Sequence, residues 1–213
     1  YLGCATIRVN AAGTGAREDV AKAAVDGLSR LGEYASKENI NVIVENHGGY
    51  SSDGKWLAGV MQQVGKKNVG TLPDFGNFCI KHEPNNWGNC IESYDRYQGT
   101  KELMPYAKGV SAKSMKFSAD GQESDIDYSR MFRIIKAARW SGIVGIEYSG
   151  SGESENEGIR KTKALLEKVF KDIRKQTGFV FFYEKSMLQK TDKISVQVKD
   201  VTIEEALKKC LRD

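Results

Sequence analysis

Three carboxylates stand at the ends of apolar stretches, where their residue type and spacing suit acid–base or metal chemistry. Glu45 ends Val-Ile-Val-Glu, Asp74 lies in Thr-Leu-Pro-Asp-Phe-Gly-Asn, and Glu147 lies in Gly-Ile-Glu-Tyr. A carboxylate that ends an apolar strand is costly to desolvate unless it is paired, hydrogen-bonded or bound to a metal. Three converging carboxylates repel one another, and a divalent cation is the simplest partner that holds them together. Two of them could also move a proton between opposite faces of a carbon next to a carbonyl.

Each of these carboxylates, taken alone, has an ordinary structural explanation as the cap of a neighbouring helix or the partner of a lysine. Their matching positions favour a functional site. Lys113 ends another apolar stretch and would neutralise a substrate oxyanion or phosphate, and a salt bridge to one of the carboxylates explains it equally well. His47 would serve as a metal ligand or an acid–base group, with a local hydrogen bond in a loop as the alternative.

Three further polar residues are candidates for substrate binding. Arg8 lies in the middle of an apolar stretch and would reach a carboxylate or a substrate oxygen. Asn10 and Asn77 have side chains suited to binding hydroxyl groups. We therefore expect all three near the carboxylates.

The elements that must position these residues alternate between strand and helix patterns. The expected strands cover Ala5–Asn10, Asn41–Asn46, Val69–Phe75, Gly109–Lys113 and Ile143–Tyr148. The expected helices cover Glu18–Lys37, Lys55–Val64, Tyr94–Tyr106, Tyr128–Trp140 and Glu157–Lys175. Polar residues end the strands at intervals of 29 to 39 residues, about the length of one βα unit. This pattern predicts a parallel α/β sheet, and the lack of a glycine-rich phosphate loop favours a barrel over a doubly wound nucleotide-binding fold.

A different pattern begins near residue 169 and divides the chain into an α/β barrel domain, 1–168, and a small α+β module, 169–213. The end of a helix precedes an aromatic strand, Phe179–Tyr183, and an alternating strand, Lys193–Val198. Thr202 then begins a final helix. This unit does not continue the spacing of the barrel.

The composition excludes some classes of function. Of 213 residues, 40% are hydrophobic and 28% charged, as in an ordinary globular protein. No apolar run approaches the roughly 18 to 20 residues that span a bilayer. The net charge of +4 comes from 32 basic and 28 acidic residues, interspersed along the chain, which argues against a nucleic-acid partner.

The four cysteines contain no Cys-x-x-Cys pair, so we do not expect a structural zinc site. Cys79 and Cys90 flank one loop. They would form a disulfide in an oxidising compartment or remain thiols in a reducing cytosol, and the sequence leaves both open.

Five motifs, in order, resemble those of the sugar phosphate isomerase/epimerase family of xylose isomerase-like TIM barrels. They are Ile-Arg-Val-Asn, Val-Glu-Asn-His-Gly-Gly, Leu-Pro-Asp-Phe-Gly-Asn-Phe, Gly-Val-Ser-Ala-Lys-Ser and Val-Gly-Ile-Glu-Tyr, within residues 1–168. The resemblance implies an isomerase or epimerase that uses a divalent metal (Mn, Mg, Co or Zn) and shifts a proton beside the carbonyl of a small sugar or sugar phosphate. It also implies that Glu45, Asp74 and Glu147 hold the metal, and that the two glutamates are the acid–base pair.

Two departures from the family pattern bear on this prediction. Ser111 stands about where the family has a metal-binding histidine, so His47 or water would have to complete the metal site. The chain also starts at what resembles the fourth strand, so the resemblance implies only the carboxyl-terminal five βα units of the (β/α)8 barrel. A whole barrel has eight units in about 250 residues. An open sheet edge would favour self-association.

The last fifty residues resemble a second family, the short N-terminal domain of secretins and TonB-dependent receptors, which is a periplasmic signalling module. This resemblance and the Cys79/Cys90 pair favour the periplasm over the cytoplasm. An alternative function follows, namely a catalytically inactive barrel fragment that carries a periplasmic binding module. A metal-dependent lyase or endonuclease of the same superfamily is a third possibility, and the near-neutral charge disfavours the endonuclease.

Overall fold

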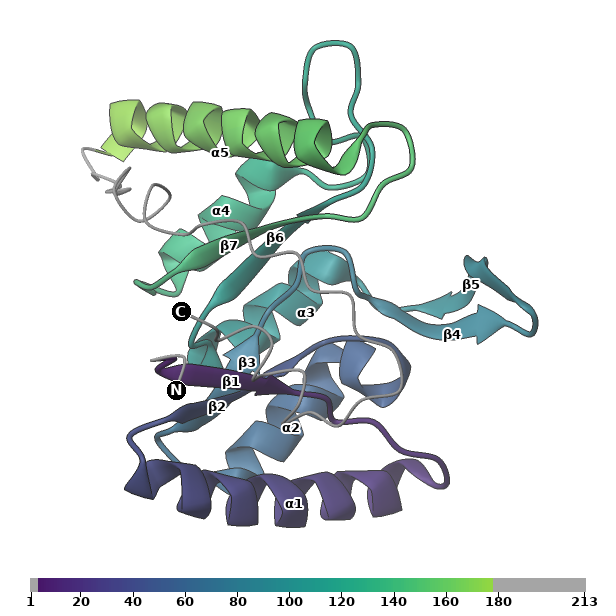
Figure 1. Ribbon diagram of the computed structural model, residues 1–213, viewed down its shortest axis with the longest axis vertical. Coiled ribbons are helices and arrows are strands. Elements are labelled where there is room, and N and C mark those ends of the chain that lie inside the picture. Colours follow the sequence, from purple (N-terminus) through teal and green to yellow (C-terminus); the bar gives the residue numbers. More distant parts are fainter. Residues whose placement is uncertain (1–3, 178–213) are drawn as a thin grey trace, which may run out of the picture.

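The computed structural model describes residues 4–177, in which five parallel strands alternate with helices (Figure 1). The strands are β1 (Thr6–Val9), β2 (Asn41–Glu45), β3 (Val69–Leu72), β6 (Val110–Ser114) and β7 (Val144–Tyr148). The helices are α1 (Arg17–Lys37), α2 (Gly54–Val64), α3 (Arg96–Leu103), α4 (Tyr128–Ala137) and α5 (Glu155–Thr177), with short 3-10 helices η1 (Gly49–Ser52) and η2 (Met104–Tyr106). The α/β alternation expected from the sequence is confirmed.

The five parallel strands lie side by side in chain order. β1, β2 and β3 form one parallel sheet, and β6 pairs in parallel with β7. Two parallel bridges, Thr71 with Ala107 and Asp74 with Ser111, join the β3 segment to the β6 segment. In the described part of the chain β1 and β7 each pair with one neighbour, so the outer edges of this partial barrel are open. Self-association through these edges stays a prediction.

Strand residues alternate between a helix-facing side and an inner side, as the pleat of a strand requires. Val42 and Val44 are fully buried in a core with α1 and α2, whereas Ile43 and Glu45 of the same strand point to the opposite side. A second core lies around Phe75. In Figure 1, α1 and α2 lie below β1–β3, and α4 and α5 lie above β6 and β7. The helices therefore leave the inner side of the sheet free, and in β2 this side carries the apolar Ile43 and the carboxylate of Glu45.

An antiparallel hairpin of β4 (Cys79–Glu83) and β5 (Asn86–Ser93) projects to the right in Figure 1. The sequence predicts only a loop here. The turn closes with Asn85 at φ 65°, a left-handed conformation that asparagine tolerates better than most residues. A disulfide joins Cys79 to Cys90, which decides between the two states left open by the sequence. Localisation itself stays a prediction.

Two helices end earlier than their patterns predict. Pro105 interrupts the expected helix Tyr94–Tyr106, because proline lacks the amide hydrogen that would continue the helical hydrogen bonds. The chain turns there into η2. α4 ends at Ala137, and Arg139 has φ 52°, which is incompatible with a right-handed helix.

α5 crosses the boundary that the sequence predicts after residue 168. Val169 and Ile173 of this helix are buried in the second core. The strands and the final helix expected beyond it lie outside the described residues, so the small carboxyl-terminal module stays a prediction.

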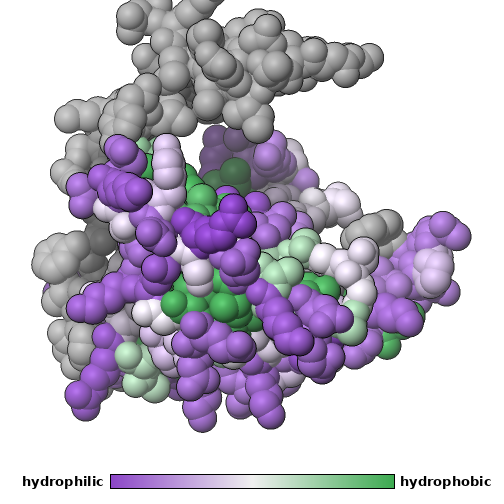
Figure 2. Space-filling model, turned by 90° about the horizontal axis from the view of Figure 1, so that it is seen from below, coloured by the Kyte–Doolittle hydropathy of each residue, from purple (hydrophilic) through white to green (hydrophobic). Residues whose placement is uncertain are grey.

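The face of the molecule seen from below is covered largely by hydrophilic residues, with hydrophobic ones gathered near its middle (Figure 2). Among the described helices, none combines the length and the apolar character needed to cross a membrane.

Candidate metal and acid–base site

The three carboxylates expected to act together do converge. One ligand oxygen from each of Glu45, Asp74 and Glu147 lies within 4.8 Å of the others. Glu45 ends β2, Asp74 lies two residues beyond β3, and Glu147 lies near the end of β7. Because parallel strands end at the same edge of a sheet, residues more than 100 positions apart in the chain meet there.

Asp74 is fully buried, and its two carboxylate oxygens differ in their hydrogen bonding. Its Oδ1 accepts hydrogen bonds from the backbone amides of Gly76 and Asn77, each at 2.9 Å. Its Oδ2 is buried and has no hydrogen-bond partner in the described part of the chain. Burial raises the pKa of Asp74 to about 6, against the opposing effects of the Lys113 charge and the Ser111 hydroxyl. One oxygen of this carboxylate is thus anchored, and the other is open to a ligand.

Glu147 is held by three donors. Lys113 Nζ lies 2.7 Å from Oε1 and Ser149 Oγ 3.1 Å from it, while Ser111 Oγ lies 3.2 Å from Oε2. Burial alone would raise the pKa of Glu147, but the hydrogen bond and charge of Lys113, with the two hydroxyls, lower it below its ordinary value. Its side chain is 40% exposed. Glu147 is therefore ionised and accessible, and the salt bridge considered for Lys113 is present.

Glu45 is more buried than Glu147 and has different partners. It forms an ion pair with Arg8 of β1, and Asn77 Nδ2 donates a hydrogen bond to Oε1 at 2.8 Å. Two of the three predicted substrate-binding residues, Arg8 and Asn77, thus lie against a carboxylate of the site. The two glutamates have separate cationic partners, which keeps both charges balanced on the inner side of the sheet.

The remaining predicted residues lie outside the group. His47 is exposed and does not belong to the converging ligand atoms, while its backbone amide donates to Ser51 Oγ at 3.0 Å. Asn10 is exposed beyond β1 and lines a separate groove with residues of α1. Their predicted roles stay predictions.

Asn46 is a positioning residue that is not among the residues predicted for the site. It is fully buried, its amide nitrogen donates to the carbonyl oxygens of Asp74 and Asn77, each at 3.0 Å, and its amide oxygen accepts from the Asp74 amide at 2.8 Å. It therefore ties the end of β2 to the loop that carries Asp74. The signal in the sequence is an asparagine directly after a strand-ending glutamate.

We expect Asn46→Ala to destabilise the protein by about 3 kcal/mol, because three hydrogen bonds are lost and buried backbone groups are left without partners. Urea unfolding would measure the change, with Asn86→Ala as the matched control. Asn86 is exposed on the hairpin and bonds Glu83 at 3.3 Å, so its loss should have little effect. Equal stability of the two variants would contradict the positioning role.

The residues present fit a divalent cation. The converging atoms are carboxylate oxygens, which hard divalent cations prefer, and the unpartnered Oδ2 of Asp74 is the buried acceptor that such an ion would satisfy. Glu45, Asp74 and Glu147 would hold it. Ser111 adds a hydroxyl 3.2 Å from Glu147 Oε2, and its predicted place as a substitute for a family metal ligand stays a prediction.

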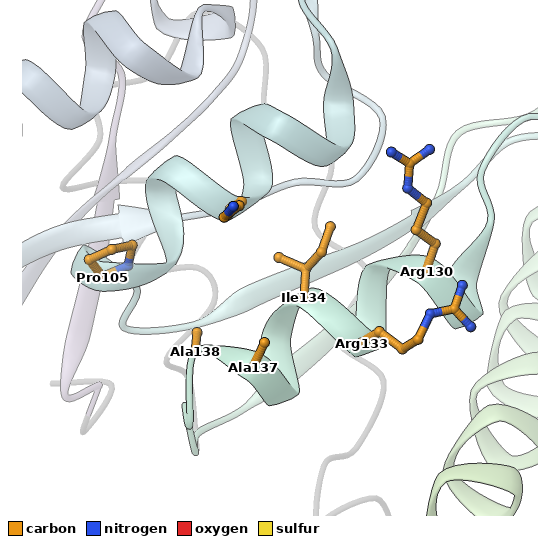
Figure 3. Close-up of a pocket in the computed structure, with 7 residues that line it drawn as sticks. Pro105, Arg130, Arg133, Ile134, Ala137 and Ala138 are labelled. Atoms are coloured by element: carbon orange, nitrogen blue, oxygen red, sulfur yellow. The ribbon is translucent and has the colours of Figure 1, made fainter.

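A separate groove of about 490 Å³ lies on the outer surface between α3 and α4 (Figure 3). Its apolar floor includes Ile134, Ala137 and Ala138, and Arg130 and Arg133 extend from α4 at its side. It contains none of the three carboxylates, so it is not part of the candidate site.

The chain belongs to the xylose isomerase-like TIM barrel family, whose model matches residues 1–169. The barrel class expected from the sequence is thereby confirmed over this stretch. No curated protein sequence matches the chain significantly. The resemblance of the tail to a secretin or TonB-receptor domain has no support from these comparisons.

Solved structures share the fold at low sequence identity. A xylose isomerase-like TIM barrel protein from Mycobacterium smegmatis in complex with magnesium has TM-score 0.57 at 17% identity, covering 78% of this chain and 61% of its own. The IOLI protein with a bound zinc atom has TM-score 0.60 at 16% identity, covering 84% and 66%. A sugar phosphate isomerase/epimerase from Parabacteroides distasonis has TM-score 0.56 at 17% identity, covering 78% and 58%. The chain thus spans less than two thirds of the length of each.

Proposed function

We propose that this chain carries the catalytic carboxylates of a metal-dependent isomerase or epimerase that moves a proton next to the carbonyl of a small sugar or sugar phosphate. The convergence of Glu45, Asp74 and Glu147 at the carboxyl ends of the strands carries the proposal. The fold neighbours support it, since one is a sugar phosphate isomerase/epimerase and two others contain magnesium or zinc.

Glu147 is suited to act as the base that removes the proton. Its lowered pKa keeps it ionised at neutral pH, and its exposed fraction leaves it accessible to a bound sugar. Lys113 holds the carboxylate in one orientation, and its ammonium would stabilise negative charge that develops on a substrate oxygen nearby.

Glu45 is suited to act from the side opposite Glu147 on the same substrate carbon, the one next to the carbonyl. Arg8 and Asn77 fix its carboxylate, so it can hold a proton at a defined position and return it to the substrate. A divalent cation bound by the carboxylates would supply Lewis-acid polarisation of the sugar carbonyl. Transfer between two carboxylates on either side of the carbon would invert its configuration.

The test is the exchange of carbon-bound hydrogen with solvent. The full chain, supplied with Mn²⁺, is incubated in D₂O with a panel of ketoses, aldoses and their phosphates, and products are followed by ¹H NMR. We expect one sugar class to gain deuterium at the carbon next to the carbonyl, and removal of the metal with a chelator to abolish the exchange.

Two results would contradict the proposal. A Mn²⁺-loaded chain that acts on no sugar would contradict the isomerase assignment and favour the inactive-fragment alternative. Isomerisation without deuterium incorporation would contradict the proton-transfer mechanism, because the hydrogen would then not pass through solvent-exchanging carboxylates.

A further inference from the structure

The ligand atoms that converge at the carboxyl ends of the strands are all oxygen. In the described part of the chain the group contains the carboxylates of Glu45, Asp74 and Glu147 and neither histidine nor cysteine. His47, the histidine nearest in sequence, is exposed and lies outside the group. The donor set therefore lacks nitrogen and sulfur.

A second, independent observation points to a ligand at this place. Asp74 is fully buried, and its Oδ2 has no hydrogen-bond partner among the described residues. A buried carboxylate oxygen without a partner carries a large desolvation cost that a bound cation removes. The site is thus more than a cluster of acidic residues.

Ser111 is the neutral side chain placed to complete this group. It lies on β6, its backbone is bridged to that of Asp74, and its hydroxyl is 3.2 Å from Glu147 Oε2. The residue is 7% exposed. Its hydroxyl is thus an oxygen donor beside Glu147, and no histidine or cysteine stands with the carboxylates in the described part of the chain.

We infer that Ser111 sets the metal preference of the site, which takes a hard cation such as Mg²⁺ or Mn²⁺ and lacks the soft donor that would strengthen Zn²⁺ binding. Carboxylate, hydroxyl and water ligands suit Mg²⁺ and Mn²⁺, whereas thiolate and imidazole ligands suit Zn²⁺. The inference rests on the proposed function, which places a metal at this site. It adds the class of metal that is bound and the residue, Ser111, that determines this class.

Two substitutions add a soft donor at this position. Ser111→Cys is nearly isosteric, so it changes the donor atom with little change in volume. Ser111→His needs more room, and the strand geometry provides it, because the partner of Ser111 on β7 is Gly145, which has no side chain. The nearest atom to a Cβ built at Gly145 is the Val110 carbonyl oxygen at 3.8 Å.

The experiment is equilibrium dialysis of the full chain against Mn²⁺ and Zn²⁺ separately, with bound metal measured by elemental analysis. Wild type should bind about one equivalent of Mn²⁺. Ser111→Cys and Ser111→His should each raise the affinity for Zn²⁺ about tenfold or more and leave the affinity for Mn²⁺ within about threefold of wild type. Ser36→Cys, which adds a thiol on the exposed face of α1, should leave both affinities unchanged.

An unchanged ratio of Zn²⁺ to Mn²⁺ affinity in both Ser111 variants would overturn the inference, as would a wild-type chain that binds neither metal. Folding of each variant is checked by circular dichroism, and the near-isosteric cysteine variant decides the outcome if the histidine variant unfolds. The readout is separate from catalysis. A chain that binds Mn²⁺ with the expected variant pattern but exchanges no sugar hydrogen would contradict the proposed function and leave this inference standing.

Discussion

Glu147→Gln is expected to slow sugar isomerisation by roughly a hundred- to ten-thousandfold, the usual contribution of a general base. The amide has the shape of the carboxylate but cannot accept a proton from carbon. In the wild-type protein the partners Lys113, Ser111 and Ser149 keep Glu147 ionised, which is the state that a base requires. The loss should appear in kcat, because the substituted group acts in the transition state more than in binding.

The matched control is Glu33→Gln, the same chemical change at an exposed position on α1. It should leave the rate and the melting temperature unchanged. Both variants are compared in the deuterium-exchange assay, at a saturating concentration of the same metal. A rate for Glu147→Gln that equals the control would show that another group removes the proton.

Asp74→Asn is expected to have two opposite effects: loss of metal binding and a gain in stability of the metal-free protein. Burial raises the pKa of Asp74 from 3.8 to about 6, so the ionised side chain destabilises the folded state. The cost is absent at low pH, where the group is protonated in both the folded and unfolded states. It grows as the pH rises above the unfolded value and is complete above the folded one, where it is about 3 kcal/mol.

Thermal unfolding in the presence of a chelator measures this effect. At about pH 8 the Asp74→Asn variant should melt roughly 5 to 10 °C above wild type, and at about pH 4 the difference should nearly vanish. Asp26→Asn is the control, because Asp26 lies exposed on α1 and forms a 3.5 Å ion pair with the exposed Arg30. A variant that is no more stable than wild type at either pH would contradict the desolvation cost. Retention of Mn²⁺ by Asp74→Asn would contradict its role as a ligand.

The α/β architecture and the three carboxylates of the candidate site could be predicted from local sequence patterns. The apolar strands recur at the spacing of βα units, because each unit needs one buried strand and one amphipathic helix. A carboxylate at the end of a buried strand needs a partner, so Glu45, Asp74 and Glu147 could be recognised from the sequence alone. Their convergence also follows from sequence, since parallel strands place such ends at one edge of the sheet.

The partners of these carboxylates were decided only by the tertiary structure. Lys113 faces Glu147 because the register of β6 against β7 sets those two residues opposite each other, and Arg8 reaches Glu45 across the β1–β2 pair. Register joins segments about 35 residues apart and leaves no local signal. For the same reason the sequence gives no local sign that the Asn46 side chain hydrogen-bonds to the backbone of Asp74.

The conformations of the loops likewise depend on tertiary contacts. The hairpin after β3 has a weak strand pattern with register irregularities, and the Cys79–Cys90 bond depends on the two cysteines meeting across it. His47 follows Glu45 by two residues, yet the turn into η1 leaves its side chain exposed and outside the carboxylate group. Position in the sequence showed which residues end a strand. The path of the loop decided which of the residues beyond it reach the site.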